Sequence, residues 1–257
     1  MKLALLCGLL LLSGAVPAQE KDPSRTWHNL SLQFGVNQIR DENLHPKVST
    51  GTITEFSYGF EKRRKNWQKF HLTLGYSRLK TKLEDLSKTI NLKINLGYSN
   101  GFRLTHGAKF LYYLGPEVTL AYNDSYLPNW DDSHFYWADY LSVGVRNSFW
   151  VKVKSRSEWV SDISVPLFSV FSRPDLYRLY KIDDTSFGGM LGNLNSNITA
   201  AHLTNVFFVL FRTEYRFPVF KNQVQAFTYS FEWVRVRHDD GNPYNQLSNQ
   251  IGIKFYL

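Results

Sequence analysis

Apolar and polar residues alternate along most of this chain. The cleanest run covers residues 90–99, where one face carries Ile90, Leu92, Ile94, Leu96 and Tyr98 and the other carries Asn91, Lys93, Asn95, Gly97 and Ser99. Successive side chains of a β-strand point to opposite faces, so this period of two predicts a strand with one apolar and one polar face. Similar runs predict about ten strands, at residues 29–37, 54–60, 70–77, 90–99, 108–120, 141–154, 159–167, 206–217, 223–237 and 246–257.

The connections between these runs fall into two classes. Short turns are predicted at residues 62–66, 99–101, 155–157 and 218–222. Longer polar loops are predicted at residues 40–48, 80–88, 123–134, 171–203 and 238–245. Because the two classes alternate along an even number of strands, all short turns fall at one end of the sheet and all long loops at the other. This sorting favours an all-β, closed antiparallel transmembrane β-barrel of about ten strands, with twelve as the alternative, over a soluble exported sandwich or barrel.

The last predicted strand carries a second signal. Its final residues resemble the C-terminal insertion signal of bacterial outer-membrane β-barrels, and the matching positions are Gln250, Gly252, Phe255 and Leu257. The resemblance implies a Gram-negative outer-membrane protein, porin-like in architecture, that is surrounded by membrane lipid and lipopolysaccharide. It also implies that the barrel-assembly machinery reads these four residues, and that both termini lie in the periplasm.

The N-terminus predicts export. Residues 1–18 begin with one charge at Lys2, continue through an apolar core at residues 3–12 and end in small residues up to Ala18, which is the pattern of a cleaved signal peptide. Residues 19–257 then form a single barrel domain. The only cysteine, Cys7, lies in the signal segment and follows Leu6, where lipoprotein processing requires a small residue, so no lipid anchor is expected. The mature chain has no thiol for a disulfide, a metal or catalysis.

Composition narrows the partners. The chain has 30 Lys plus Arg against 22 Asp plus Glu, a formal net charge of +8. These cations are scattered along alternating strands and form no basic patch, so nucleic acid is not an expected partner. No spaced set of ligands predicts a metal site, and no cofactor is expected.

Charged residues recur on the polar faces of the predicted strands. They carry both signs and would be costly against lipid, so they are expected in the lumen: Glu55, Glu61, Lys93, Lys109, Glu117, Arg146, Lys152, Arg212, Glu214, Arg216, Glu232 and Lys254. Two interpretations remain, a selective pore and an ion-pair network that plugs the barrel. A barrel of about ten strands has little room after its side chains are placed, which favours the plug.

Two loop clusters are candidates for catalysis. One contains Asp131, Asp132, Ser133 and His134, and the other begins with His238 and Asp239. They are loosely similar to the omptin family of outer-membrane proteases, which are ten-stranded and use Asp and His pairs at the mouth. Outer-membrane phospholipases and lipid A acyl hydrolases use Ser and His at the outer rim, which adds His202 to the candidates.

No catalytic constellation stands out, because general acid-base chemistry needs a geometry that these short clusters do not specify. The sequence therefore favours a non-enzymatic barrel, acting as a narrow pore or as an accessory subunit of a larger outer-membrane assembly. The alternative is a rim enzyme that acts on lipid or peptide.

The longest break in the alternation, residues 171–203, is the expected seat of specificity. Ser172 with Asp175 three residues later resembles a capping box and predicts a short helix through Lys181. Its glycines allow sharp bends. The segment either projects to hold a protein partner or folds inward as a plug.

Overall fold

The computed structural model describes residues 25–43, 47–63, 66–81, 88–105, 107, 109–128, 135–154, 157–174, 198–201, 204–220, 223–237 and 241–257. Its strands are β1 (Arg25–Asp41), β2 (Ser49–Arg63), β3 (Asn66–Lys80), β4 (Lys88–Arg103), β5 (Phe110–Tyr126), β6 (Phe135–Trp137), β7 (Asp139–Lys154), β8 (Ser157–Ser172), β9 (Ile198–Ala201), β10 (Val206–Phe220), β11 (Gln223–Val236) and β12 (Tyr244–Tyr256). Within these residues, no helix has the length and apolar character needed to cross a membrane.

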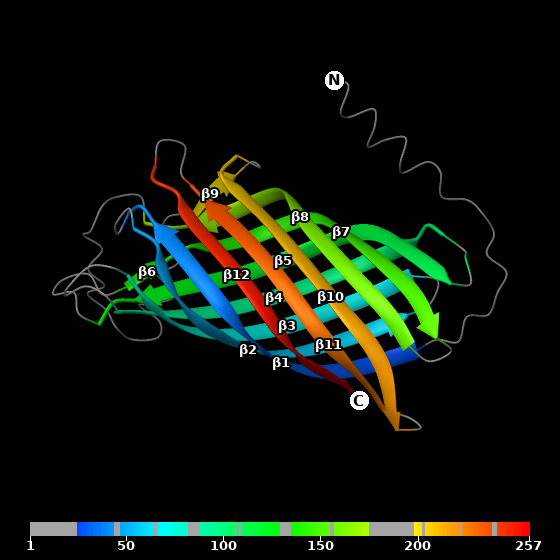
Figure 1. Cartoon of the computed structure of the whole chain (residues 1–257). Coiled ribbons are helices and arrows are strands. Elements are labelled where there is room, and N and C mark those ends of the chain that lie inside the picture. The colour runs from blue at the N-terminus through cyan, green and yellow to red at the C-terminus, as the bar shows by residue number, and fades with distance from the viewer. Residues whose placement is uncertain are drawn as a thin grey trace, which may run out of the picture.

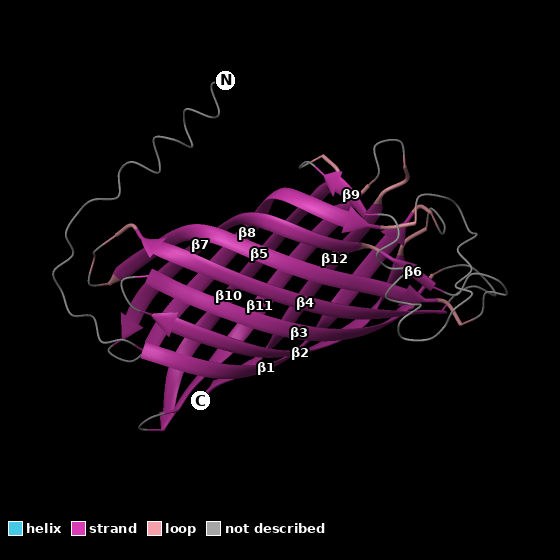
Figure 2. Ribbon diagram, turned by 180° about the vertical axis from the view of Figure 1, so that it is seen from behind, coloured by secondary structure: helices cyan, strands magenta, loops and turns pink. Residues whose placement is uncertain are grey.

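Ten of these strands form a closed antiparallel barrel (Figures 1 and 2). Sequence neighbours pair around the ring, β8 pairs with β10, and β1 pairs with β12 to close it. Two short strands lie outside the ring, because β6 pairs only with β5 and β9 pairs only with β8. The prediction of a closed antiparallel barrel of about ten strands is confirmed.

The barrel has two different ends. We call the end with the short connections at residues 64–65, 155–156 and 221–222 the turn end, and the opposite end the loop end. The described chain begins and finishes at the turn end, where the Leu257 N–H donates a hydrogen bond of 2.8 Å to the His28 carbonyl. The expected signal peptide at residues 1–18 lies outside the described residues.

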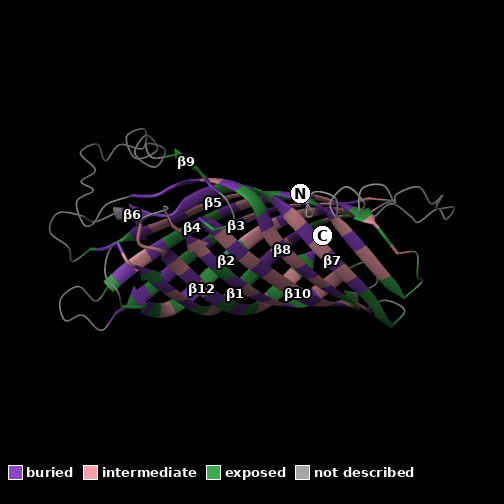
Figure 3. Cartoon of the chain, turned by 90° about the horizontal axis from the view of Figure 1, so that it is seen from above, coloured by how far each residue is buried: buried purple, intermediate pink, exposed green. Residues whose placement is uncertain are grey.

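The alternating residues form two different surfaces of the barrel, a polar interior and an apolar outer wall. Polar residues of β4 such as Asn91, Lys93 and Asn95 are buried, while the apolar residues between them are exposed or half-buried. Colouring by burial shows this alternation along the strands of the barrel (Figure 3). Large apolar side chains are exposed around the outer wall, among them Leu32, Phe34, Val36, Phe56, Leu74, Leu92, Ile94, Val118, Leu141, Val143, Ile251 and Ile253.

The predicted turn at residues 99–101 is wrong, because β4 continues to Arg103. Gly101 lies inside the strand beneath aromatic rings, and a Cβ atom there would be 3.1 Å from the Tyr113 Cβ and 3.3 Å from the Trp67 Cε3. Packing against the rings, and not a positive φ in a turn, explains this glycine. The connection to β5 falls at residues 104–109 instead.

The strand that was least regular in sequence, predicted at residues 159–167, is β8 and extends further in both directions. Its irregularity has a structural cause. Val143 pairs with Phe168 and Gly144 pairs with Pro166, so Leu167 is an extra residue in a β-bulge. Both Leu167 and Phe168 are consequently exposed, which interrupts the period of two.

Candidate functional site

The interior of the barrel holds the predicted charges, and its centre is an ion-pair triad. Lys93 on β4 lies between Glu55 on β2 and Glu232 on β11, and its Nζ is 3.0 Å from the Glu55 Oε1. All three side chains are buried. In the strand order, β12, β1, β2 and β3 separate β11 from β4. The triad therefore joins opposite walls of the barrel.

A second network lies around Asp162 on β8. Its Oδ2 accepts hydrogen bonds of 2.8 Å from the Lys69 Nζ on β3 and from the Arg146 Nη2 on β7, and its Oδ1 accepts one of 2.6 Å from the Ser148 hydroxyl. Arg146 also donates to the Glu117 Oε1 at 2.7 Å. Lys69 reaches Asp162 across the barrel, so this network also spans the interior.

Aromatic rings and a guanidinium fill the turn end. Arg216 forms a bidentate ion pair with Glu61 on β2, at 3.0 and 2.9 Å, and its Cζ lies 4.4 Å from the Trp150 ring centroid and 4.6 Å from that of Tyr256. The carboxylate of Glu214 also binds Arg216 and accepts a hydrogen bond of 2.6 Å from Lys254. Buried Trp67, Tyr113, Trp150 and Val160 complete the cluster.

The loop end is filled by an apolar cluster. It comes from inward positions on most of the barrel strands, and Tyr140 stacks on Phe208 with ring centroids 5.4 Å apart. Its members are Ile39, Leu79, Ala121, Ala138, Tyr140, Phe171, Ala201, Val206, Phe208, Leu210, Val234, Val236 and Tyr244. A uniformly polar interior, as the alternation of β4 suggested, is therefore found only in the middle of the barrel.

The first residues of the 171–203 segment are held at the mouth. Arg173 is fully buried and donates to the Val236 carbonyl at 3.0 Å, to the Asn242 carbonyl and to the Asp41 carboxylate. The Asn43 side chain donates to the Pro174 carbonyl at 2.7 Å. The start of the segment is thus bound to the ends of β1 and β11. The predicted helix from Ser172 through Lys181 lies largely outside the described residues, and β9 accounts for residues 198–201.

One small cavity lies between these layers, among the described residues. This cavity is lined by Gln33, Lys69, Asp162, Arg212 and Lys254 and has a volume of only about 20 Å³. Such a space holds about one water molecule. In the part of the chain that the structure describes, packed side chains occupy the cross-section at the turn end, in the middle and at the loop end.

The structure places most of the expected lumen charges inside the barrel. Lys93, Glu117, Arg146, Glu214, Arg216 and Glu232 are buried, and Arg212 lines the small cavity. Lys109 and Lys152 differ from the expectation, because both are exposed at the turn end. Because β4 extends to Arg103, β5 begins only at Phe110, and Lys109 lies in the connection before it. The Lys109 carbonyl accepts a hydrogen bond of 2.8 Å from the Lys152 N–H.

The candidate catalytic residues cannot be placed in this geometry. Asp131, Asp132, Ser133, His134, His202, His238 and Asp239 all lie outside the described residues. Sequence reasoning also missed Lys69, Asp162 and Arg173 as interior charges. A signal was present for the first two, since each lies on the polar face of an alternating run, next to Phe70 and Ile163.

Comparison with solved structures identifies the fold. The outer-membrane protease OmpT from Escherichia coli superimposes with a TM-score of 0.56 and 7% identity, over 95% of this chain and 100% of that chain. The translocator domain of the autotransporter NalP from Neisseria meningitidis gives a TM-score of 0.41 and 11% identity, over 98% and 95% of the two chains. No protein-family model matches the sequence, and no curated protein matches it. The chain has the fold of the outer-membrane β-barrels.

Proposed function

We propose that this protein is a non-conducting outer-membrane barrel that acts as a rigid support for its loops, as an accessory subunit of a larger outer-membrane assembly. The observation that carries the proposal is the set of ion pairs that join opposite walls. An open pore leaves its charged residues in water, whereas Lys93, Arg146 and Arg216 are buried and bound by carboxylates. Removing water from so many charges is compensated only when each has a close partner.

The outer wall supports the membrane placement. Exposed leucine, isoleucine, valine and phenylalanine side chains surround the barrel, and a soluble protein rarely exposes apolar surface on this scale. In the membrane, closure of the barrel leaves no strand edge in contact with lipid. We place the turn end in the periplasm and the loop end outside the cell, as in bacterial barrels with short periplasmic turns and long outer loops.

Planar-bilayer recording tests the absence of conductance. The purified full-length protein is expected to insert without producing regular conductance steps, because packed side chains occupy the barrel at three levels. A heat-modifiable shift on a gel checks that the inserted sample is folded. Reproducible conductance steps whose size rises with salt concentration would show a continuous water path through the barrel. That result would contradict the proposal.

The second candidate function is a hydrolase at the outer rim. Its support is the shared fold with a solved outer-membrane protease, together with the Asp and His clusters of the loops. Under our first proposal, the protein turns over neither a peptide library nor phospholipid vesicles. If turnover is found and is abolished by His134→Ala or His238→Ala, with folding unchanged, the rim enzyme replaces the inert support. Lys47→Ala, in another loop at the same end, serves as the control.

A further inference from the structure

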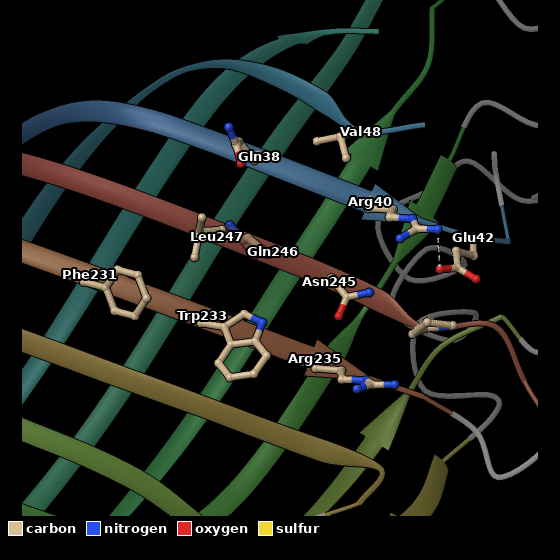
Figure 4. A pocket seen from close by; sticks show the side chains of 11 residues that line it. Gln38, Arg40, Glu42, Val48, Phe231, Trp233, Arg235, Asn245, Gln246 and Leu247 are labelled. Carbon is tan, nitrogen blue, oxygen red and sulfur yellow. Dashed lines mark ion pairs between the residues drawn. The ribbon is translucent and has the colours of Figure 1, made fainter. Parts of the chain in front are cut away.

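A groove of about 610 Å³ lies on the outer wall near the loop end, where β1, β12 and β11 run side by side (Figure 4). Arg40, Asn245 and Arg235 lie on its loop-end side, to the right in Figure 4, while Trp233, Leu247 and Phe231 lie further along the strands toward the turn end. The volume is in the range of small-molecule sites, although the groove is open on the side that faces away from the barrel.

The strand register arranges these side chains in rows. Arg40 pairs with Asn245, and Asn245 pairs with Arg235, so two guanidinium groups lie in one row across the three strands. The next row toward the turn end contains Gln38, Leu247 and Trp233, and the row after that contains Val36, Asn249 and Phe231. Neighbouring strands are about 4.8 Å apart, which separates the backbones of the two arginines by about 10 Å.

Arg40 and Arg235 take no part in the ion pairs described above for the barrel interior. Within the described part of the chain, the Arg235 Nε is buried and has no hydrogen-bond partner. Arg40 pairs with Glu42 at 3.1 Å, but its side chain is 47% exposed. An exposed ion pair of this kind contributes little to stability. Exchanging Glu42 for another anionic partner of Arg40 therefore costs little stability, and Arg235 lies in the same row.

We propose that this groove binds a phosphorylated lipid of the outer leaflet, the lipid A part of lipopolysaccharide, with its phosphate between Arg40 and Arg235. The acyl chains then lie along Leu247 and Phe231 and continue over the exposed Ile251. The proposal rests on the membrane placement proposed above.

Charge complementarity and the order of the rows select this occupant. Guanidinium groups form strong, often bidentate hydrogen bonds with phosphate. Free phosphate satisfies the arginines but gives no role to Leu247, Trp233 and Phe231 in the next two rows. Trp233 lies in the row next to the two arginines, which is the level that tryptophan prefers at a membrane interface. A phosphorylated lipid fits all three rows together.

The test measures binding of purified lipid A to the full-length protein by native mass spectrometry in detergent. The double variant Arg40→Gln with Arg235→Gln is expected to bind lipid A at least about tenfold more weakly, because each guanidinium contributes a charge-assisted hydrogen bond. The matched control is Lys80→Gln with Lys88→Gln. These two lysines pair across β3 and β4 at the same end, are exposed, and carry the same total charge.

The control variant is expected to retain the wild-type affinity. If both double variants lose the same affinity for lipid A, the effect is one of general surface charge. If the arginine variant loses no affinity, the proposed site is wrong. Inorganic phosphate at millimolar concentration is the third arm. If it binds as well as lipid A does, a site for free phosphate replaces the lipid site. None of these outcomes changes the expected bilayer recordings. The lipid site and the proposed non-conducting function are therefore tested independently.

Discussion

Replacing Lys93 by methionine is expected to lower the free energy of unfolding by about 3–5 kcal/mol, the usual effect of removing one partner from a buried ion pair. The change leaves the carboxylates of Glu55 and Glu232 buried without the ammonium group that both contact. Their mutual repulsion adds to the cost of keeping each out of water. Urea-induced unfolding of the protein in lipid vesicles, followed by tryptophan fluorescence, measures the loss.

Two variants separate this effect from a general effect of the substitution. Lys88→Met removes an exposed lysine from the same strand, and its effect is expected to stay within about 0.5 kcal/mol. The triple variant Lys93→Met, Glu55→Gln and Glu232→Gln removes the whole set of charges and is expected to recover most of the lost stability. If Lys93→Met behaves like Lys88→Met, the triad does not hold the two walls together.

Periodicity predicted the barrel because a barrel strand has two chemically different environments along its whole length. In β4, the inward polar face and the outward apolar face both follow directly from the period of two. Where both faces are apolar, the pattern carries less information. Val206, Phe207, Phe208 and Val209 alternate between the interior and the outer wall without any change in polarity. The apolar cluster at the loop end was therefore not predicted.

The partners of the interior charges could not be predicted for a different reason. Lys69 and Asp162 are far apart in sequence, and they meet because closure of the ring brings β3 opposite β8 at one particular stagger. No local pattern encodes that stagger. Gly101 shows the same limit, since an Asn-Gly pair is a strong turn signal. Only the rings of Trp67 and Tyr113 packed around it explain a glycine inside a strand.

The end of the chain is where the structure and the proposed insertion signal overlap. Phe255 pairs with Leu30 on β1 and with Gln225 on β11, so it lies at the seam that closes the ring. The Tyr256 hydroxyl donates a hydrogen bond of 2.5 Å to the Glu214 carboxylate, which also binds Arg216. Tyr256, which lies between two of the residues that resemble the insertion signal, therefore completes the packing of the turn end.

Deleting residues 255–257 is expected to reduce the folded fraction in the outer membrane to about a tenth or less. A lost hydrogen bond to a buried charge costs about 1.5–3 kcal/mol, and the paired ends of β1 and β11 are lost in addition. The control deletes residues 189–191, three residues of the long connection, and is expected to assemble normally. Heat-modifiable gel shifts of membrane fractions measure both.

Refolding of the two purified variants into vesicles, where no assembly machinery is present, distinguishes recognition from closure. We expect the variant that lacks residues 255–257 to refold with reduced yield, because Glu214 and Arg216 lose the Tyr256 side chain that covers them. In cells we expect a larger defect, because the resemblance to the insertion signal predicts that the assembly machinery also reads these residues. Equal yields of the two variants in vesicles, with a defect in cells alone, would assign these residues to recognition and remove their role in closing the barrel. Equal assembly in cells would remove both roles.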